Sequence, residues 1–246
     1  MLPVFAVDRL PPMGPAVLGG PEGRHGALVL RVRAGEFVEL TDGRGGAARC
    51  RVLAAGRDGL ELYVQALRRD PASAPRVVVV QALAKGEHAE LAVDLLTQVG
   101  VDEIVPWAAQ RCVVRWSGER GERALRRLRS TAHAAAKQSR RVHWPVVASL
   151  AATAQVETRL AAATLGLVLD PAAERPLAGV GVPRAGEIVI VVGPEGGLTD
   201  AEFATLASGL RCRVGPTVLR SSSAGALAAA VVLAGTPRGI DRPPPR

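Results

Sequence analysis

The sequence predicts an α/β protein, and three observations support this class. Hydrophobic residues make up 48% of the 246 residues and charged residues 22%, which is typical of a globular chain with a sizeable core. The N-terminal part alternates short apolar and polar runs, whereas continuous apolar runs alternate with helix-like segments after Pro75. We therefore expect two domains, residues 1–72 and 73–246, with Arg68–Pro75 as the linker.

The first domain is predicted to consist of short β-strands. Apolar residues alternate with polar ones between Phe37 and Val64, and turn-forming clusters interrupt the pattern at Asp42–Gly46 and Gly56–Gly59. Strands with turns at this spacing are typical of a small barrel or sandwich.

The second domain is predicted to hold a largely parallel sheet, because its strands are apolar on both faces. We expect strands at Arg76–Leu83, Asp102–Pro106, Leu165–Pro171, Glu187–Pro194 and Cys212–Pro216. We expect helices at Glu87–Val99, which Gly100 ends, at Ser117–Arg141, after Thr199 and near Ser222.

Positive charge is concentrated in one segment. The net charge is +8, and Ser117–Pro145 alone holds eight basic and two acidic residues. An arginine-rich composition would explain the total charge but not its location. The segment is either a solvated helix face or a surface that grips phosphates, and we favour contact with RNA or DNA. The candidate RNA-binding residues are Arg123, Arg126, Arg127, Arg140 and Arg141.

Several classes of protein are not expected. The three cysteines are scattered without a CxxC pair, and the four histidines lack the spacing of metal ligands. The N-terminus does not resemble a signal peptide, and the longest apolar stretch, Ala226–Ala234, is too short to cross a bilayer. We expect a reduced, soluble, cytoplasmic protein without a metal or a membrane partner.

The stretch Val191–Phe203 (VVGPEGGLTDAEF) predicts a ligand site. Its glycines lie between the end of a strand and a helix that a Thr199–Glu202 capping box would begin. Ligands of open α/β sheets bind there. The lysine of a phosphate-binding P-loop is absent, and so is the G-x-G-x-x-G dinucleotide motif. Because Glu195 would repel a phosphate, a ligand with a cationic or neutral polar part suits this turn better.

A second constrained stretch, Val214–Gly235, has the same plan of strand, Gly-Pro and helix. Ser221–Ser223 are expected to cap a helix of small residues that permits close backbone packing. Arg220, directly before it, is either a surface arginine or a site residue.

These two stretches together resemble the SPOUT class of methyltransferases, and more narrowly the ribosomal RNA small-subunit methyltransferase E family. Members of this family methylate N3 of a uridine in 16S rRNA. Further segments that match the family in order and spacing are Lys85–Glu90, Val99–Cys112, Lys137–Arg141 and Leu169–Pro171.

The resemblance implies a fold, a cofactor and partners. It implies a PUA-like RNA-binding β-barrel over residues 1–72, followed by a SPOUT domain over 73–246 with a deep trefoil knot. It also implies S-adenosylmethionine as cofactor, a homodimer, and 16S rRNA, within the small ribosomal subunit, as substrate. Arg220 would be catalytic by favouring the uridine anion, and Gly196 is expected to hold a positive φ. The implied cofactor residues are Leu169, Gly193, Glu195, Gly196, Val214, Leu219, Ser221 and Ala224.

The sequence departs from the family's pattern at four positions. Ser222 replaces a glutamate, Leu95 and Gln98 replace a lysine and a glutamate, and Lys137 replaces a glutamate. Two alternatives therefore stay open: another SPOUT RNA methyltransferase with a different target, and a non-catalytic RNA-binding relative.

Overall fold

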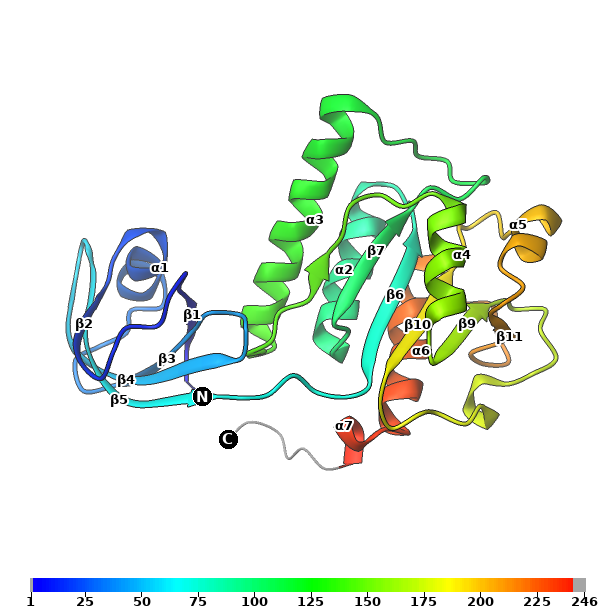
Figure 1. Ribbon diagram of the computed structural model, residues 1–246. Helices are drawn as coiled ribbons and strands as arrows, with labels where there is room; N and C mark the ends of the chain where they lie inside the picture. Colours follow the sequence, from blue (N-terminus) through cyan, green and yellow to red (C-terminus); the bar gives the residue numbers. More distant parts are fainter. Residues whose placement is uncertain (1, 241–246) are drawn as a thin grey trace. The chain divides into compact units, whose positions relative to one another are not determined.

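The computed structural model describes residues 2–240 and divides the chain into two compact units (Figure 1). The first unit contains the residues up to Ala72 together with Ala136–Trp144. The second contains Ser73–Ala135 and the described residues from Pro145 onward. Sequence reasoning did not anticipate that Ala136–Trp144 would pack with the first unit.

A five-stranded sheet forms the body of the first unit, in the order β1-β3-β4-β5-β2. Only β1 and β3 pair in parallel. Among the described residues β1 and β2 are the two edges, so a closed barrel stays a prediction. The elements are β1 (Val4–Ala6), β2 (Gly14–Leu18), α1 (Gly20–Arg24), the π-helical turn η1 (His25–Val29), β3 (Phe37–Thr41), β4 (Gly46–Gly56) and β5 (Gly59–Arg69).

Alternation along the strands builds the core of this unit. On β5, Leu60, Leu62 and Val64 are buried, whereas Glu61 and Tyr63 between them are exposed. Periodicity did not predict α1 and η1, because these helices are each only five residues long.

The segment Ala136–Trp144 is held to the first unit by specific contacts. The Gly45 N–H donates to the Val142 carbonyl at 2.8 Å, and the Lys137 ammonium lies 2.6 Å from a Glu22 carboxylate oxygen. A side chain on Gly43 would lie 2.8 Å from the Trp144 ring, so Gly43 permits the close approach of that indole.

The second unit contains a six-stranded sheet, in the order β11-β9-β10-β6-β7-β8, and every strand pair is parallel. The prediction of a largely parallel sheet is confirmed. Its strands are β6 (Arg76–Ala82), β7 (Glu103–Trp107), β8 (Val146–Val147), β9 (Leu165–Leu169), β10 (Glu187–Val192) and β11 (Leu210–Cys212). Its helices are α2 (Gly86–Val99), α3 (Gly118–Gln138), α4 (Thr153–Ala162), the 3-10 turn η2 (Leu177–Gly179), α5 (Asp200–Thr205), α6 (Ser221–Ala234) and α7 (Pro237–Ile240).

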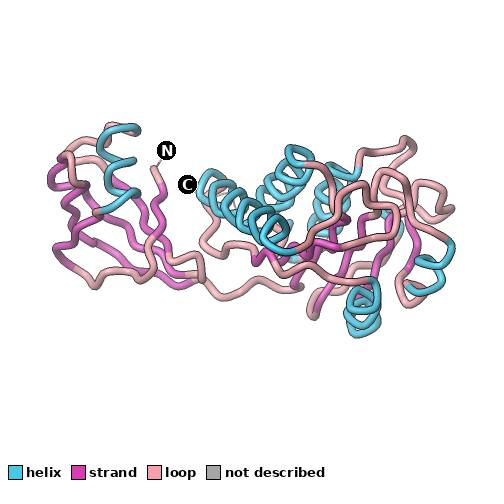
Figure 2. Tube along the Cα trace, turned by 90° about the horizontal axis from the view of Figure 1, so that it is seen from above, coloured by secondary structure: helices cyan, strands magenta, loops and turns pink. Residues whose placement is uncertain are grey.

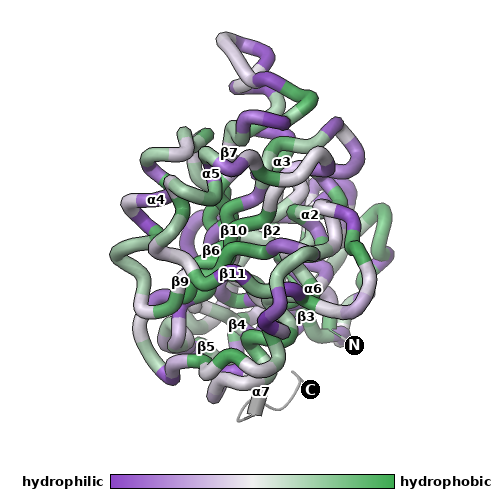
Figure 3. The backbone as a smooth tube through the Cα atoms, turned by 90° about the vertical axis from the view of Figure 1, so that its right-hand side faces the viewer, coloured by the Kyte–Doolittle hydropathy of each residue, from purple (hydrophilic) through white to green (hydrophobic). Residues whose placement is uncertain are grey.

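Helices cover both faces of this sheet (Figure 2). Val77 and Val79 of β6 pack with α2, α3 and α6, whereas Val78 and Val80 pack with α4 and α5 on the other face. The stretches Val77–Val80 of β6 and Ile188–Val192 of β10 are therefore continuously hydrophobic (Figure 3). This explains the continuous apolar runs in the sequence.

Three local predictions have clear outcomes. Helix α2 ends at Gly100, which holds a left-handed φ of 107° as expected. The strand expected at Cys212–Pro216 is wrong in its bounds, because β11 ends at Cys212. The serine cap of α6 is also wrong: the N-cap residue is Arg220, and no side chain caps the helix.

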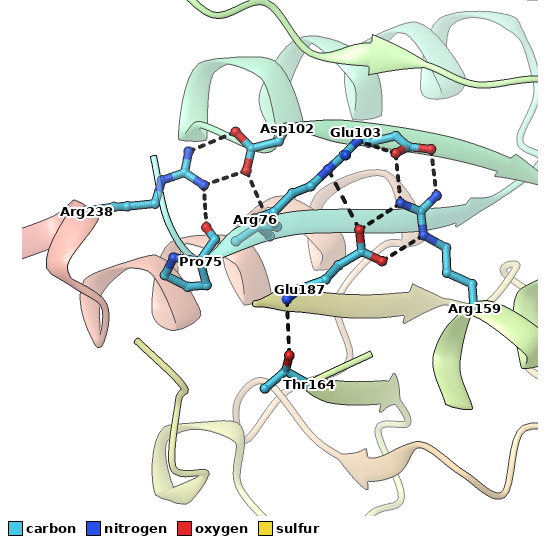
Figure 4. Close-up of polar contacts among 9 residues, drawn as sticks. Pro75, Arg76, Asp102, Glu103, Arg159, Thr164, Glu187 and Arg238 are labelled. Atoms are coloured by element: carbon cyan, nitrogen blue, oxygen red, sulfur yellow. Dashed lines mark hydrogen bonds and ion pairs between the residues drawn. The ribbon is translucent and has the colours of Figure 1, made fainter. Parts of the chain in front are cut away.

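Charged side chains cluster at the amino ends of the central strands (Figure 4). Arg159 of α4 contacts Glu103 at 2.6 and 2.8 Å and Glu187 at 3.0 Å, and Arg76 lies between the same two carboxylates. The hydrogen bonds that Arg159 donates to Glu103, and then to Glu187, raise the pKa of Arg159. The cluster links β6, β7, β10 and α4 at the amino ends of these strands.

We predict that Arg159→Ala lowers the free energy of unfolding by about 2–3 kcal/mol, because it leaves the nearly buried Glu103 carboxylate with Arg76 as its remaining partner. Urea denaturation followed by circular dichroism measures the loss. The control is Arg123→Ala, which removes an exposed ion pair and should cost about 0.5 kcal/mol or less. Equal losses in the two variants would contradict a structural role for this cluster.

Candidate active site

A pocket opens where the carboxyl ends of β9, β10 and β11 meet. It encloses about 430 Å³, which is in the range of roughly 300–1,000 Å³ typical of small-molecule sites. Its walls come from the residues that follow the three strands, at the side of the sheet where α/β proteins bind ligands. The lining residues are Leu169, Asp170, Pro171, Val192, Gly193, Pro194, Glu195, Gly197, Leu198, Phe203, Arg213, Val214, Gly215, Thr217, Val218, Leu219, Arg220, Ser221 and Ala224.

The structure brings the candidate cofactor residues together around this pocket. Leu169, Gly193, Glu195, Val214, Leu219, Ser221 and Ala224 all line it, and so does Arg220. Gly196 lies in the same loop but does not line the pocket.

The loop from Gly193 to Leu198 is shaped by its helix cap and by one glycine. Thr199 and Glu202 form the expected capping box, since the Glu202 N–H donates to the Thr199 hydroxyl at 3.2 Å and the Thr199 N–H to the Glu202 carboxylate at 2.9 Å. The expected positive φ at Gly196 is wrong: the residue in the left-handed region is Gly197, with φ 70°. The Gly197 N–H closes the turn by donating to the Pro194 carbonyl at 2.9 Å.

Arg111 supports this loop from outside the pocket. Its guanidinium donates to the Gly196 carbonyl at 3.0 Å and to the Leu198 carbonyl at 3.3 Å. A Cβ atom on Gly196 would lie 3.3 Å from the Arg111 Cβ, so the absence of a side chain at Gly196 leaves room for this arginine. Sequence reasoning missed this role, because Arg111 is 85 residues from its partner along the chain.

A hydrogen bond joins the two ligand loops. The Ser221 hydroxyl at the start of α6 donates to the Glu195 carboxylate at 2.7 Å. Glu195 therefore braces the loop. The other carboxylate of the pocket, Asp170, is 8% exposed and is paired with Arg211.

Arg220 is the free cation at the rim of the pocket. Its side chain is exposed, and within residues 2–240 it makes no hydrogen bond or ion pair. Arg213, by contrast, donates to the carbonyls of Ala173 and Glu174. Of these two pocket arginines, Arg220 has its guanidinium available to a substrate.

Other side chains that carry catalysis in many enzymes are not available here. Burial raises the pKa of Cys112, raises that of Cys212 to about 11 and, together with Glu39, raises that of Cys50 to about 11. The thiolate nucleophile is thereby disfavoured at each position. The described pocket lining contains no histidine, and across residues 2–240 no cluster of His, Cys, Asp and Glu could hold a metal ion. No helix in that range is long and apolar enough to span a membrane.

The basic residues predicted to bind RNA fall in two places. Arg123, Arg126 and Arg127 are exposed on α3 in the second unit, whereas Arg140 and Arg141 follow that helix in the first unit. Arg123 lies 3.4 Å from Glu119, and Arg127 lies 2.7 Å from Glu90. Arg126 makes no ion pair within residues 2–240.

Comparison with known proteins identifies the family. Residues 71–233 match the RNA methyltransferase domain, and residues 18–64 match the RNA methyltransferase PUA domain. The chain is 43% identical over 236 residues to ribosomal RNA small subunit methyltransferase E of Mycobacterium tuberculosis, with 93% of this chain and 90% of that protein covered.

The chain belongs to the ribosomal RNA small subunit methyltransferase E family. The enzyme of the same name from Bacillus subtilis is 26% identical over 83% of this chain and 84% of its own length. The resemblance seen in the two glycine-containing stretches is confirmed.

Solved structures share the fold. The methyltransferase E structure from Neisseria gonorrhoeae, bound to S-adenosyl methionine, has a TM-score of 0.83 at 24% identity and covers 95% of this chain and 97% of its own. A Legionella pneumophila methyltransferase in complex with the cofactor SAM has a TM-score of 0.84 at 23% identity, over 96% and 98% of the two chains.

The four departures from the family's pattern have distinct surroundings. Ser222 is 4% exposed at the start of α6, and Leu95 packs partly buried against the core beneath α2. Gln98 donates to Asp94 at 2.8 Å. Lys137 is paired with Glu22, so its change of sign relative to the family is balanced within this chain.

We predict that Gly197→Ala weakens S-adenosylmethionine binding about tenfold or more, because an L-residue held at positive φ costs about 1–2 kcal/mol and the pocket wall must shift to relieve it. Gly196→Ala, the control, requires Arg111 to move by a few tenths of an ångström and should cost less. Isothermal titration calorimetry measures both affinities. The reverse order of effects would contradict the assigned turn.

Proposed function

We propose that this protein transfers a methyl group from S-adenosylmethionine to N3 of a uridine in the 16S rRNA of the small ribosomal subunit. The observation that carries the proposal is the pocket at the ends of β9, β10 and β11, with the unpaired Arg220 at its rim. Family membership, and relatives named for methylating small-subunit rRNA, support the substrate class.

The pocket suits S-adenosylmethionine chemically. Leu169, Leu198 and Leu219 supply apolar walls, the backbone of Gly193–Gly197 can approach a ligand closely, and Glu195 brings a carboxylate compatible with a sulfonium. When bound, this cofactor supplies an electrophilic methyl group. The chain's own contribution is to fix the donor, exclude water and position the acceptor base.

Arg220 is the proposed catalytic residue. The proton on uridine N3 is weakly acidic, comparable with a tyrosine hydroxyl of pKa about 10, so it has to be lost for N3 to attack. A guanidinium beside the base stabilises the N3 anion electrostatically, so that the proton passes to solvent water without a histidine base, which the described pocket lining lacks. The target base has to leave its stack to reach this rim.

The finer fold follows the same proposal. Helix α6 packs against Val79 and Val192 of the sheet and contacts η2, and Gly235 directly after the helix lies beside Val182 of the β9–β10 connection. Contact of α6 with both the sheet and this connection is in keeping with the deep trefoil knot of the SPOUT class. The knot is therefore part of the proposal.

Partner surfaces are proposed on both units. Leu91 of α2 and Leu227 and Val231 of α6 are exposed apolar side chains on two helices that contact each other, and they support a homodimer. In the first unit, the match of residues 18–64 to an RNA methyltransferase PUA domain supports a PUA-like RNA-binding role.

Two rival functions remain distinguishable. A SPOUT RNA methyltransferase with another target would share the pocket, and a non-catalytic RNA-binding relative is favoured only by Ser222, which stands where the family has a glutamate. Mass spectrometry of rRNA from a strain that lacks the gene separates the three functions: loss of methyluridine in 16S rRNA supports the proposal, loss of another modification supports the first rival, and no loss supports the second.

We predict that Arg220→Ala keeps the fold and cofactor affinity but lowers methyl transfer about 10²–10³-fold. Arg220→Lys should rescue poorly, because a point charge does not reproduce the planar guanidinium. The defect should shrink as pH rises from 7 to about 9.5 toward the pKa of uridine, because solvent then supplies the deprotonated base. A methylation assay on small-subunit particles measures this. Wild-type turnover would remove Arg220 from the mechanism, and a defect constant with pH would restrict it to positioning.

We predict that Arg126→Gln with Arg127→Gln weakens RNA binding and lowers the slope of log affinity against log salt by about 1–2 units, as loss of two phosphate contacts requires. The control, Arg175→Gln with Arg184→Gln, removes the same charge from the β9–β10 connection. Fluorescence anisotropy at several salt concentrations measures both. Equal slopes in the two variants would identify the α3 arginines as a solvated face.

A further inference from the structure

Gln81 is a buried polar side chain that does not line the pocket. It lies near the carboxyl end of β6, in register with Val192 of β10 and Pro106 of β7. It is 6% exposed, and the other residues from Val77 to Ala82 are apolar. A polar group inside a parallel sheet lowers stability unless its hydrogen bonds are satisfied.

The hydrogen bonds of this amide are incomplete. The Gln81 Nε2 atom donates to the Ser221 carbonyl and to the Ala82 carbonyl, each at 3.4 Å. Within residues 2–240, the Gln81 Oε1 atom is the one buried side-chain nitrogen or oxygen that has no hydrogen-bond partner. An unsatisfied buried group of this kind calls for an explanation in structure or in function.

The direction of the amide explains why its oxygen is unpaired. Ser221 and Ala82 both offer carbonyl groups, which accept hydrogen bonds and do not donate them, so the nitrogen end of the amide has to face them. The oxygen is thereby turned toward α6, where a Cβ atom on Gly225 would lie 3.3 Å from it. A glycine has no side chain that could donate to it. The unpaired oxygen is therefore a consequence of the contact with Ser221.

The contact with Ser221 reaches the candidate active site. Ser221 is the first residue of α6, and its hydroxyl donates to the Glu195 carboxylate at 2.7 Å. Arg220 is the N-cap residue, and its carbonyl accepts two N–H groups of the first turn at 3.0 and 2.9 Å. The backbone of the proposed catalytic arginine thus belongs to the turn that Gln81 holds.

Two side chains from the carboxyl ends of neighbouring strands therefore fix the start of α6. Glu195 follows β10 and holds the Ser221 hydroxyl, and Gln81 of β6 holds the Ser221 carbonyl. The helix has no side-chain cap of its own. A displacement of about 1 Å at a reacting group can lower a rate about 100-fold, so the placement of this turn matters for the chemistry.

We propose that Gln81 is a positioning residue for methyl transfer: its amide tethers the first turn of α6 to β6 and so sets where the Arg220 guanidinium stands at the pocket rim. This inference rests on the proposed methyltransferase function and adds to it a residue outside the pocket. Because the tether leaves a buried oxygen unpaired, it lowers the stability of the fold while it fixes the site. Loss of the amide therefore lowers activity without lowering stability.

The test replaces Gln81 by methionine in the full-length protein. Methionine has a similar length and volume but carries no nitrogen or oxygen that needs a partner. Gln81→Met should lower kcat for 16S rRNA by about tenfold or more and leave KM for the RNA unchanged. The midpoint of urea denaturation should not fall, because an unpaired buried oxygen is removed.

The control is Ser222→Ala, in the same turn of α6. Ser222 is 4% exposed, and its hydroxyl makes no hydrogen bond within residues 2–240. This variant changes a buried side chain at the start of the helix without touching the tether, so kcat should stay close to that of the wild type. If Gln81→Met does not fold, Gln81→Asn takes its place, because its amide is one methylene too short to reach Ser221.

Two further measurements examine the tether itself. Hydrogen–deuterium exchange needs no activity: in Gln81→Met the backbone amides of Ser223 and Ala224 should exchange faster, whereas those of later turns of α6 should not. A double variant with Arg220→Ala tests the route to the chemistry. Its kcat should be no lower than that of Arg220→Ala alone, because the tether acts through that arginine.

The results separate this inference from the proposed function. Wild-type kcat in Gln81→Met, or unchanged exchange in the first turn of α6, would overturn the positioning role. A lower urea midpoint with faster exchange along the whole helix would also overturn it, since Gln81 would then only stabilise the fold. So would additive losses in the double variant. Faster exchange confined to the first turn, in a protein whose wild type methylates no rRNA, would refute the proposed function and leave the tether in place.

Discussion

The close packing of α6 against the parallel sheet fixes the geometry of the candidate site. At Gly225 a Cβ atom would lie 3.0 Å from a Val192 methyl group and 3.3 Å from both Gln81 and Val79. Only a helix of very small residues can approach so closely. Because Val192 directly precedes the loop that begins at Gly193, this contact sets how far the start of α6 stands from that loop. The Ser221–Glu195 hydrogen bond then links the start of α6 to this loop.

The carboxyl and amino ends of the strands in the parallel sheet have different roles. At the carboxyl ends of β9, β10 and β11, loops with small residues leave a pocket with an unpaired arginine. At the amino ends of β6, β7 and β10, Arg159 and Arg76 neutralise two carboxylates and tie the strands together. Asp102 and Arg238 form a further ion pair near this edge, and Arg238 also donates to the Pro75 carbonyl. These ion pairs lie at the amino ends of the strands, away from the pocket.

Local signals in the sequence predicted much of the fold and the site. Apolar runs predicted the parallel sheet, Gly100 predicted the end of α2, and Thr199 with Glu202 predicted the start of α5. Each of these features depends on residues that are close in the chain. The predicted cofactor residues gathered around one pocket because they follow adjacent parallel strands.

Features that depend on contacts between distant residues were not predictable. Arg111 supports the loop at Gly196 across 85 residues, and Lys137 pairs with Glu22 across 115. Two glycines are adjacent in this turn, and the sequence pattern does not specify which of them adopts the positive φ.

The burial of all three cysteines has a practical consequence for spectroscopy. Cys50 and Cys212 are 0% exposed and Cys112 is 6% exposed, so thiol-reactive dyes meet no accessible native thiol in the folded protein. A single cysteine introduced at Val218, which is 80% exposed beside the pocket, would therefore carry a fluorophore at a unique site. Such a label would report on ligand entry in real time without removal of any native residue from the core.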